Sequence, residues 1–555
     1  MSELFNISDR LTQSAQTVPD HVAIAVPGSR DASGNRQYDQ RTFAEFEADV
    51  SRLASQLQHL GIQKGDRMVL MVPPGIEFIE LTFALFRAGA IVVLIDPGMG
   101  RKNIFSCLKQ IEPQGIIGVE MVHWIRMLFG LTSKQHRCHI CVNSSLTSNF
   151  LPGTVSWKKF TNGPIDLTPP VTTMTDPAAI IFTSGSTGPP KGVLYEHQMF
   201  NAQVDLLQQA FQIEPGGADL PGFPLFALFN LALGLTTVVP DMNPTRPAEV
   251  KPENIFEAFN DWSVTQAFGS PAFWNQVGRS LSQNKQTFPQ IDRLFSAGAP
   301  VPVDVIERIV PALTKPGADI FTPYGATEAL PVCLISGREV LEQTAELTRQ
   351  GAGTCVGRPF PGVDVRVIKR TDGPIEDWSA VQLLPAGEIG EIIASSPSVT
   401  KEYYRHPEAS RAAKIWQGES HWHRMGDLGY FDELGRLWFC GRKAHLVQTA
   451  EGVMYPVRCE AIFNTHPNIY RSALVGKGPV GQQTPVLIVE PEADHWPTTP
   501  QQKQTLTEQL LSIGQQNELT QSIQNIVFHK ALPVDRRHNV KIHREDLKTW
   551  IDQQK

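Results

Sequence analysis

Short apolar runs alternate with longer amphipathic stretches along this chain, and this alternation constrains the fold more than any other feature. A helical pattern over residues 43–60 is followed by a buried-strand pattern over residues 67–72. A second pair, a strand and then a helix, occupies residues 178–182 and 198–211. Because strands that alternate with helices build a sheet covered by helices, the sequence predicts an α/β architecture.

The length of 555 residues exceeds one compact core, since a domain typically has about 100–200 residues. Around residues 385–440 the pattern changes to short strands with tight turns, and residues 430–439 indicate a hairpin whose turn uses Asp and Gly. Helix and strand alternation resumes after Gly441. We therefore expect one domain over residues 1–440 and a second over residues 441–555.

Composition excludes several classes of protein. Hydrophobic residues make up 41% and charged residues 19%, which is typical of a globular chain and not of a disordered one. The net charge of -7 does not suggest nucleic acid, which would require a basic face, so no nucleic-acid partner is expected. The N-terminus lacks a basic start before an apolar stretch, and the apolar runs over residues 78–97 and 223–240 are interrupted or short. Neither a secretory signal nor a transmembrane segment is expected.

Seven cysteines, an odd number scattered over a long chain, favour reduced thiols and a cytoplasmic location over a disulfide framework. Cys138 and Cys141 have the spacing of a metal or redox pair. A zinc site would need a second pair of ligands at similar spacing, and none follows in the sequence. We interpret these two thiols as structural.

The most informative segment begins at Thr183 and reads TSGSTGPPKG between two apolar strand patterns. Glycines let backbone N–H groups approach a phosphate closely, and Ser and Thr hydroxyls add donors. Lys191 adds a compact positive charge for the outer phosphates of a nucleotide. The segment is not a Walker P-loop, because Pro190 stands where that motif has glycine. The pattern predicts a phosphate-binding loop, and a flexible surface loop is the alternative.

This segment resembles the signature loop of the adenylate-forming (ANL) superfamily, which includes acyl-CoA synthetases and peptide-synthetase adenylation domains. Further motifs follow in the family's order over almost the whole chain. The resemblance implies ATP and Mg²⁺ as cofactors and ATP and a carboxylic acid as small-molecule substrates. It also implies a large N-terminal domain of two α/β subdomains plus a small distorted β-barrel, followed by a small mobile C-terminal α+β domain. The implied ATP-binding and catalytic residues of the loop are Thr183, Ser184, Gly185, Ser186, Thr187, Gly188 and Lys191.

Residues 321–328, which read FTPYGATE, resemble the family's adenine and metal motif. The match implies that Tyr324 stacks on adenine, with Gly325 and Ala326 beside it in the ATP site. It also implies that Thr327 bonds the α-phosphate and that Glu328 ligates Mg²⁺, a cation that prefers oxygen ligands. Taken alone, the Thr-Glu pair could instead begin a helix as a capping pair.

Two further segments resemble nucleotide-binding motifs. Gly298, Ala299 and Pro300 match the wall of the adenine pocket, although small residues also suit an ordinary turn. Asp427, within RMGDLG, matches the acceptor of the ribose hydroxyls, and a lone Asp at such a place is otherwise a turn residue. Arg442 matches the residue that contacts ribose or phosphate at the hinge between the two domains.

Lys541 matches the C-terminal lysine that contacts the substrate carboxylate and the α-phosphate when the small domain closes. The Thr/Ser-Gly that usually precedes this lysine is replaced here by RRHNV at residues 536–540. Lys530 fits less well, because it precedes the Leu-Pro landmark at residues 532–533. A surface lysine is the alternative interpretation of Lys541.

Many relatives that transfer the acyl group to a thiol carry His in a Pro-Leu-Phe-His segment, where this chain has Ala227. Together with residues 94–103 and 234–248, the segment most resembles the β-lactone synthetases of bacterial olefin biosynthesis. In that group the 3-hydroxyl of an adenylated long-chain 2-alkyl-3-hydroxy acid attacks the acyl carbon, closing a lactone and releasing AMP. Phe223, Phe226 and Phe229 are candidate lining residues of an apolar acyl pocket, or else ordinary core residues.

Three functions remain open from the sequence. The first is a β-lactone synthetase, and the second is a ligase that passes the acyl group to CoA or to a carrier thiol. The third is a catalytically silent AMP-binding module, against which Lys191, Glu328 and Lys541 argue together. CoA is a substrate only in the second, and an acyl substrate allows association with other enzymes of lipid metabolism.

Overall fold

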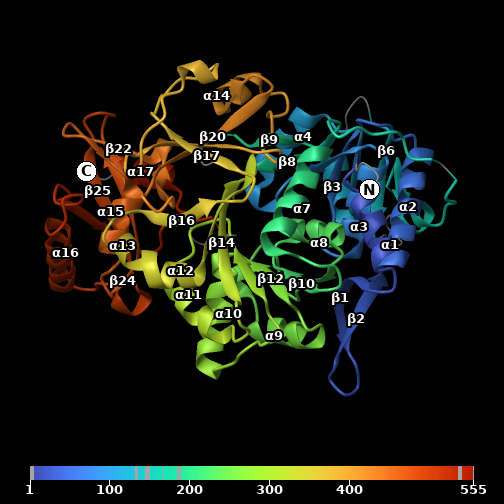
Figure 1. Ribbon diagram of the computed structural model, residues 1–555, viewed down its shortest axis with the longest axis horizontal. Coiled ribbons are helices and arrows are strands. Elements are labelled where there is room, and N and C mark those ends of the chain that lie inside the picture. Colours follow the sequence, from blue (N-terminus) through green and yellow to red (C-terminus); the bar gives the residue numbers. More distant parts are fainter. Residues whose placement is uncertain are drawn as a thin grey trace.

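The computed structural model describes residues 5–131, 136–143, 151–166, 168–183, 189–535 and 541–553. It is a mixed α/β protein with two large sheets in its N-terminal part and a smaller sheet near the C-terminus (Figure 1). The α/β class predicted from the sequence is confirmed.

A seven-stranded sheet carries the segment that leads into the predicted phosphate loop. Its order is β7-β6-β5-β3-β4-β8-β9, and every neighbouring pair is parallel except β8 with β9. The strands are β3 (Arg67–Met71), β4 (Ile91–Leu94), β5 (Gly115–Val119), β6 (Cys138–Val142), β7 (Thr154–Ser156), β8 (Pro177–Thr183) and β9 (Lys191–Glu196). The two runs predicted as strands at residues 67–72 and 178–182 are thus β3 and β8.

Helices of this part follow the predicted amphipathic stretches. The predicted helix at residues 43–60 is α2, and Thr42 begins it with a capping box: Thr42 Oγ1 accepts from the Glu45 N–H, and Glu45 accepts from the Thr42 N–H. The apolar run at residues 78–97 is buried as helix α3 and strand β4. The helices are α1 (Asp9–Thr17), α2 (Phe43–His59), α3 (Ile76–Arg87), α4 (Arg101–Ile111), α5 (Glu120–Leu128), α6 (Trp157–Thr161), α7 (His197–Phe211) and α8 (Ala227–Leu233).

The second and larger sheet positions most of the candidate site. Its strands are β1 (Val22–Arg30), β2 (Arg36–Thr42), β10 (Ala218–Pro221), β11 (Thr236–Val238), β12 (Gln266–Gly269), β13 (Arg293–Ser296), β14 (Asp319–Ala326), β15 (Ala329–Ser336), β16 (Thr354–Pro359), β17 (Asp364–Ile368), β18 (Gly390–Ser395), β19 (Lys414–Gln417), β20 (Ser420–Phe431) and β21 (Leu437–Arg442). Strands β10, β12, β13 and β14 are neighbours and parallel, so their carboxyl ends share one edge of the sheet. In open α/β sheets ligands bind at that edge.

The expected small β-barrel is wrong for the described part of the chain. Strand β16 pairs with β15 on one side and with β21 on the other, so the strands of residues 354–442 continue the large sheet. Strand β17, at the far end of this order, has only β18 as its neighbour. A barrel needs its end strands to pair with each other, and the edge that closure would use is taken by β15.

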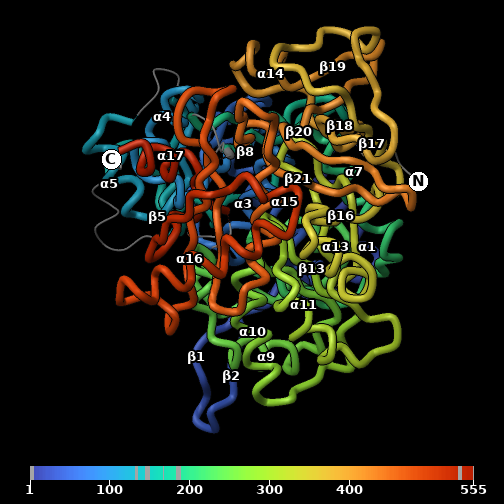
Figure 2. The backbone as a smooth tube through the Cα atoms, turned by 90° about the vertical axis from the view of Figure 1, so that its left-hand side faces the viewer, coloured from blue at the N-terminus to red at the C-terminus, as the bar shows by residue number. Residues whose placement is uncertain are grey.

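Five helices and a helical turn accompany the large sheet. They are α9 (Pro252–Asp261), α10 (Pro271–Asn284), α11 (Val303–Ile309), α12 (Gly337–Glu339), α13 (Ala345–Arg349) and α14 (Pro407–Ala413). Strands β1 and β2 lie at the end of the large sheet opposite to β17. Their two-stranded ribbon extends away from the body of the molecule, as two views show (Figure 1, Figure 2).

The C-terminal part, after β21, has a three-stranded sheet of its own, in the order β24-β25-β26. Its buried residues form two clusters that draw on this part of the chain alone. The elements are β22 (Val447–Gln448), β23 (Val453–Met454), α15 (Pro456–Phe463), β24 (Ile469–Lys477), β25 (Thr484–Pro491), α16 (Pro500–Gln515), β26 (Asn525–Phe528) and α17 (Arg544–Gln553). The structure thus combines a large N-terminal part with a small C-terminal α+β part.

Candidate active site

The turn between β14 and β15 presents the predicted adenine and metal motif. Tyr324 and Ala326 lie on β14, and Ala326 pairs with Ala329 across the turn. The turn is tight at Gly325, because a Cβ there would lie 2.8 Å from the Ala329 carbonyl oxygen. Residues 327–328 connect two strands, so the alternative that they begin a helix is wrong.

Tyr324, Asp427 and Arg442 form one polar cluster, in which Asp427 is buried and the other two side chains are half-buried. The Tyr324 hydroxyl donates to Asp427 Oδ2 at 2.6 Å, and Arg442 Nε lies 3.0 Å from Asp427 Oδ1. Asp427 and Arg442 are cross-strand partners on β20 and β21, which explains how residues far apart in sequence meet. The predicted hairpin at residues 430–439 is the connection between these two strands.

Burial is the largest influence on the pKa of Asp427 and of Tyr324. It raises the pKa of Asp427 above its ordinary value, although Arg442 and the Tyr324 hydroxyl act in the opposite direction. Burial and the charge of Asp427 raise the pKa of Tyr324, so the phenol stays protonated and remains a donor. The carboxylate of Asp427 lies where it could accept hydrogen bonds from vicinal hydroxyls.

Glu328 is held by its neighbours on a third segment. The Tyr403 hydroxyl donates to Glu328 Oε1 at 2.7 Å, and the Thr400 N–H donates to the Glu328 carbonyl oxygen at 2.9 Å. A fixed carboxylate with hard oxygen donors suits Mg²⁺, which keeps several ligands from water and phosphate. The donor chemistry therefore fits the metal that the resemblance implies. Among the described residues there is no group of three or more His, Cys, Asp and Glu side chains that could hold a metal by themselves.

Behind Glu328 lies a lysine that sequence reasoning missed. Lys414 on β19 is only 2% exposed, and its ammonium donates to the Thr400 carbonyl oxygen. Burial lowers the pKa of Lys414 to about 7. Thr400 is hydrogen-bonded both to Lys414 and to the backbone of Glu328. Through these bonds β19 helps to fix the turn that carries the Glu328 carboxylate.

Lys191 is the first residue of β9 and pairs with Thr183 at the end of β8. Its ammonium lies 5.1 Å from the centre of the Tyr403 ring, in the geometry of a cation–π contact. Tyr403 thus contacts both Lys191 and Glu328. The loop residues Ser184, Gly185, Ser186, Thr187 and Gly188 lie outside the described residues, as does the side chain of Thr183.

The segment of residues 298–300 follows the carboxyl end of β13. Gly298 has φ +96°, a left-handed conformation that favours glycine, and a turn there brings Ala299 and Pro300 after the strand. The buried Ser296 ends β13 directly before this turn. The segment therefore lies at the edge of the sheet where ligands of such folds bind.

Lys541 lies close enough to Arg442, Asp427 and Glu328 for their charges to act on it. Burial, and then the charge of Arg442, lower the pKa of Lys541, while Asp427 and Glu328 oppose the shift. The Lys541 carbonyl oxygen accepts from the Asp535 N–H at 2.9 Å, which anchors its backbone. A residue near the C-terminus is thus within electrostatic range of Glu328 in the β14–β15 turn and of Asp427 on β20. Residues 536–540, where the sequence departs from the family pattern, lie outside the described residues.

An apolar cavity of about 80 Å³ lies beside the site, between α7, α8 and the large sheet. Phe226 and Phe229 line it as predicted, whereas Phe223 packs against Phe226 with ring centres 5.5 Å apart and is not in the lining. The lining also includes Gln203, Leu207, Phe211, Ile213, Asp219, Asn230, Leu233, Gln266, Phe268, Phe295, Ala297, Pro323, Leu330, Pro331, Leu334 and Phe360. Ala227, at the place of the thiol-transfer His, is buried in the adjoining core.

One end of this cavity is polar, a feature that the sequence reasoning also missed. Asn230 donates to Asp219 Oδ2 at 2.7 Å, and both side chains are buried. Asp219 is paired in register with Gln266, near the amino ends of β10 and β12 and therefore away from the edge that carries residues 298–300. Burial raises the pKa of Asp219 to about 7, more than the hydrogen bond from Asn230 lowers it. An Asp inside the otherwise apolar strand Ala218–Pro221 was the available signal in the sequence.

We expect Asp219→Asn to stabilise the fold increasingly as the pH rises. Because the folded-state pKa of Asp219 lies near 7, above that of the unfolded chain, the folded wild type loses stability between about pH 4 and pH 7. The variant lacks this loss and keeps an acceptor for Asn230. The variant-minus-wild-type free energy of unfolding should increase by roughly 3 kcal/mol from pH 5 to pH 8, measured by urea denaturation. A difference that does not change with pH, as expected for the exposed control Asp39→Asn, would contradict the assignment.

The Cys138 and Cys141 thiols are buried on β6, and the seven cysteines are free. Burial raises the pKa of Cys138 to about 12, so this thiol is not a reactive thiolate. Within the ranges that the structure covers, no helix has both the length and the apolar character needed to cross a membrane.

Comparisons with known proteins show the family of this chain. A profile described as "AMP-binding enzyme" matches residues 11–404. Olefin beta-lactone synthetase of Xanthomonas campestris pv. campestris is 43% identical, with 100% of this chain and 99% of the relative covered. The protein of the same name from Stenotrophomonas maltophilia is 42% identical, covering 99% of this chain and 98% of the relative.

Solved structures share the fold at low sequence identity. The amide bond synthetase McbA of Marinactinospora thermotolerans superposes with a TM-score of 0.78 at 21% identity, covering 98% of this chain and 99% of that one. The o-succinylbenzoate CoA synthetase of Bacillus subtilis, in complex with its acyl-adenylate intermediate, gives a TM-score of 0.74 at 19% identity, with 99% of each chain covered. From its profile match and its full-length relatives, the chain belongs to the AMP-binding enzyme family.

Proposed function

We propose that the protein activates a 3-hydroxy fatty acid with ATP and then closes it to a β-lactone. In the first step a carboxylate oxygen attacks the α-phosphorus, and pyrophosphate leaves. In the second step the 3-hydroxyl oxygen attacks the acyl carbon, its proton is released, and the bond to AMP breaks. The observation that carries this proposal is full-length similarity to two olefin β-lactone synthetases.

In this proposal the Tyr324 cluster binds the nucleoside. Tyr324 stacks on adenine, and its hydroxyl fixes Asp427 through the 2.6 Å hydrogen bond. Asp427 accepts from the ribose hydroxyls, and Arg442 neutralises its charge and contacts ribose or phosphate. Gly298, Ala299, Pro300, Gly325 and Ala326 form the adenine wall, and Thr183, Ser184, Gly185, Ser186, Thr187 and Gly188 bind the phosphates.

The central physical problem is that a carboxylate must meet the anionic α-phosphate. Lys541 and Lys191 supply positive charge, and Thr327 hydrogen-bonds the α-phosphate. Mg²⁺ bound at Glu328 would supply further positive charge to the phosphate oxygens. Tyr403 and Thr400 hold Glu328 in place. The charged groups of the site therefore stabilise the transition state by their fixed positions as well as by their charge.

Two features favour lactone closure over transfer to CoA. Ala227 cannot supply the imidazole found in many thiol-transferring relatives, and the full-length relatives carry the β-lactone synthetase name. An intramolecular hydroxyl needs no site for an external thiol, because the nucleophile is already within reach of the acyl carbon. A ligase that uses CoA or a carrier thiol is the alternative.

The acyl chain would occupy the cavity lined by Phe226 and Phe229, with Phe223 supporting them from behind. Ligand pockets typically have about 300–1,000 Å³, so a cavity of about 80 Å³ must widen to admit a long chain. Phe226 and Phe229 can widen the cavity by rotating about their two side-chain torsion angles. We also propose that residues 1–440 form the adenylation domain and that residues 441–555 form a mobile lid carrying Lys541.

We place the enzyme in the cytoplasm, in accord with seven free thiols. Its product is lipid-like, so other enzymes of lipid metabolism are the partners that this function suggests.

The test compares two acids that differ by one hydroxyl, each with ATP and without CoA. The 2-alkyl-3-hydroxy acid should give AMP and a neutral product lighter than the acid by one water. The 2-alkyl acid without the hydroxyl should give only a bound acyl-adenylate, trapped by hydroxylamine as the hydroxamate. AMP formation that requires CoA, with a thioester as product, would reject lactone closure and support the alternative.

A further inference from the structure

Helix α5 is turned inside out relative to an ordinary surface helix. Its polar residues His123 and Arg126 face the protein and are 0% and 5% exposed. His123 Nε2 contacts the Ile140 carbonyl oxygen at 2.9 Å, and Arg126 donates to the Pro152 carbonyl oxygen at 3.2 Å. His123 Nδ1 and Arg126 Nε have no hydrogen-bond partner among the described residues. A buried polar side chain that lacks some of its hydrogen bonds lowers the stability of the fold. Packing of the core therefore does not by itself explain why His123 and Arg126 face the protein.

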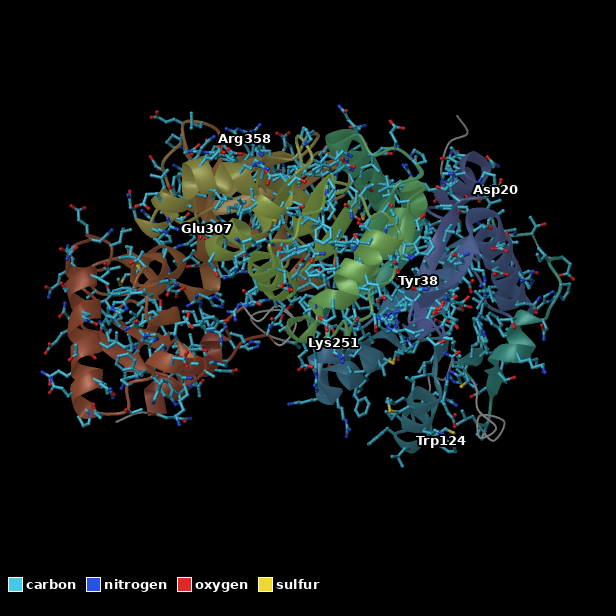
Figure 3. The ribbon with its side chains drawn as sticks, turned by 90° about the horizontal axis from the view of Figure 1, so that it is seen from below. Asp20, Tyr38, Trp124, Lys251, Glu307 and Arg358 are labelled. Atoms are coloured by element: carbon cyan, nitrogen blue, oxygen red, sulfur yellow. The ribbon has the colours of Figure 1, made fainter. Side chains whose placement is uncertain are left out.

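The outward face of the same helix is apolar. Met121, Trp124, Met127, Leu128 and the adjoining Phe129 are between 40% and 79% exposed, and Leu128 is the most exposed of them. Met121, Trp124 and Leu128 have the spacing of one helix face. Trp124 projects at the edge of the molecule, away from the body (Figure 3). An exposed apolar patch of this kind is typical of a surface that contacts a membrane or another protein.

The neighbouring helix α4 adds positive charge on one side of this patch. Lys102, Phe105 and Lys109 share a face of α4 by their spacing, and Phe105 contacts Phe129 with ring centres 5.1 Å apart. Arg101 stands beside them, and α4 contains no acidic residue. None of these three basic side chains makes an ion pair with a described residue. The charge is therefore available to an external anion, on a chain whose net charge is -7.

We propose that the α4–α5 surface, formed by Arg101, Lys102, Lys109, Met121, Trp124, Met127, Leu128 and Phe129, docks onto an anionic lipid bilayer. Exposed Trp, Leu and Phe side chains enter the boundary between headgroups and acyl chains, while Lys and Arg bind anionic headgroups. A protein partner would be expected to cover the patch with a shape-matched surface. Basic side chains on α4 without ion-pair partners among the described residues, next to exposed apolar side chains, instead suit a fluid anionic surface. Docking of this kind is peripheral and does not require a spanning helix. The inference does not depend on lactone formation.

The experiment is sedimentation of the full chain with vesicles of two compositions, either phosphatidylcholine alone or equal parts of phosphatidylcholine and phosphatidylglycerol. The wild type should bind the anionic vesicles and lose binding at high salt. Leu128→Asp should weaken binding at least about tenfold, because one large apolar side chain no longer enters the bilayer. Lys102→Glu should weaken binding several-fold, because each basic residue in contact with an anionic surface contributes about fivefold to the affinity.

The matched controls place the same changes elsewhere on the surface. Leu434→Asp, at a site 61% exposed in the β20–β21 connection, and Lys251→Glu should leave vesicle binding unchanged. Thermal unfolding verifies that each variant is folded. The proposal is overturned if the wild type binds neither vesicle, if it binds both equally, or if Leu128→Asp binds as the wild type does. It is also overturned if light scattering finds a dimer that Leu128→Asp dissociates while no vesicle binding occurs.

Discussion

Replacing Lys541 with alanine is expected to slow acyl-adenylate formation by on the order of 10²–10³-fold, the usual effect of removing one group that stabilises transition-state charge. ATP binding should persist, because Tyr324, Asp427 and Arg442 form their cluster without Lys541. Pyrophosphate release measures the first quantity, and calorimetry with a non-hydrolysable ATP analogue measures the second.

Lys530→Ala is the matched control, since it removes a lysine from the same part of the chain. Lys530 is exposed, and the sequence pattern disfavours it as the catalytic lysine. Its variant should release pyrophosphate at the wild-type rate. Equal rates for Lys541→Ala and the wild type would remove Lys541 from the mechanism, and loss of ATP binding in that variant would show a different role for it.

Glu328→Gln should produce the second large effect. The change keeps size and an acceptor for Tyr403 but removes the negative charge that attracts Mg²⁺. We expect adenylation to fall by about 10²-fold at low Mg²⁺, with partial recovery at high Mg²⁺. A titration of pyrophosphate release against Mg²⁺ measures the shift, and calorimetry of ATP binding with and without Mg²⁺ gives a readout independent of turnover.

Tyr403→Phe separates the position of Glu328 from its charge. It removes the 2.7 Å hydrogen bond but leaves the carboxylate and the ring beside Lys191. A loss of about tenfold, smaller than that of Glu328→Gln, is expected from the loss of one hydrogen bond to a charged group. If Glu328→Gln showed the wild-type response to Mg²⁺, the metal assignment would fail whatever Tyr403→Phe does.

The local patterns of the sequence predicted the elements well, because periodicity and caps act within a few residues. The strands at Arg67–Met71 and Pro177–Thr183 and the helix at Phe43–His59 were predicted within a residue or two. The prediction of the candidate site rests on contiguous motifs, as for Tyr324, Glu328 and Asp427. The contact between Tyr324 and Asp427 joins segments far apart in the sequence, which no local pattern could establish.

The remainder depends on contacts between distant segments. Tyr403 meets Glu328 across 75 residues of sequence, and Lys414 reaches it only through Thr400. The predicted barrel is wrong because β16 pairs with β15. The partner of a strand depends on the geometry of the whole sheet and cannot be deduced from its residue types. Helix α5 departs from the usual rule because Met121, Trp124 and Leu128 are exposed while His123 and Arg126 are buried.

The most direct test of the account follows the oxygen atoms of the acid. The carboxylate of a 3-hydroxy acid is labelled with a heavy oxygen isotope, and the enzyme is given ATP without CoA. If the carboxylate attacks the α-phosphate, one labelled oxygen must leave with AMP, and mass spectrometry of the nucleotide will find it there. Unlabelled AMP, or label recovered in pyrophosphate or phosphate, would contradict an acyl-adenylate and with it the mechanism proposed for Lys541, Glu328 and Asp427.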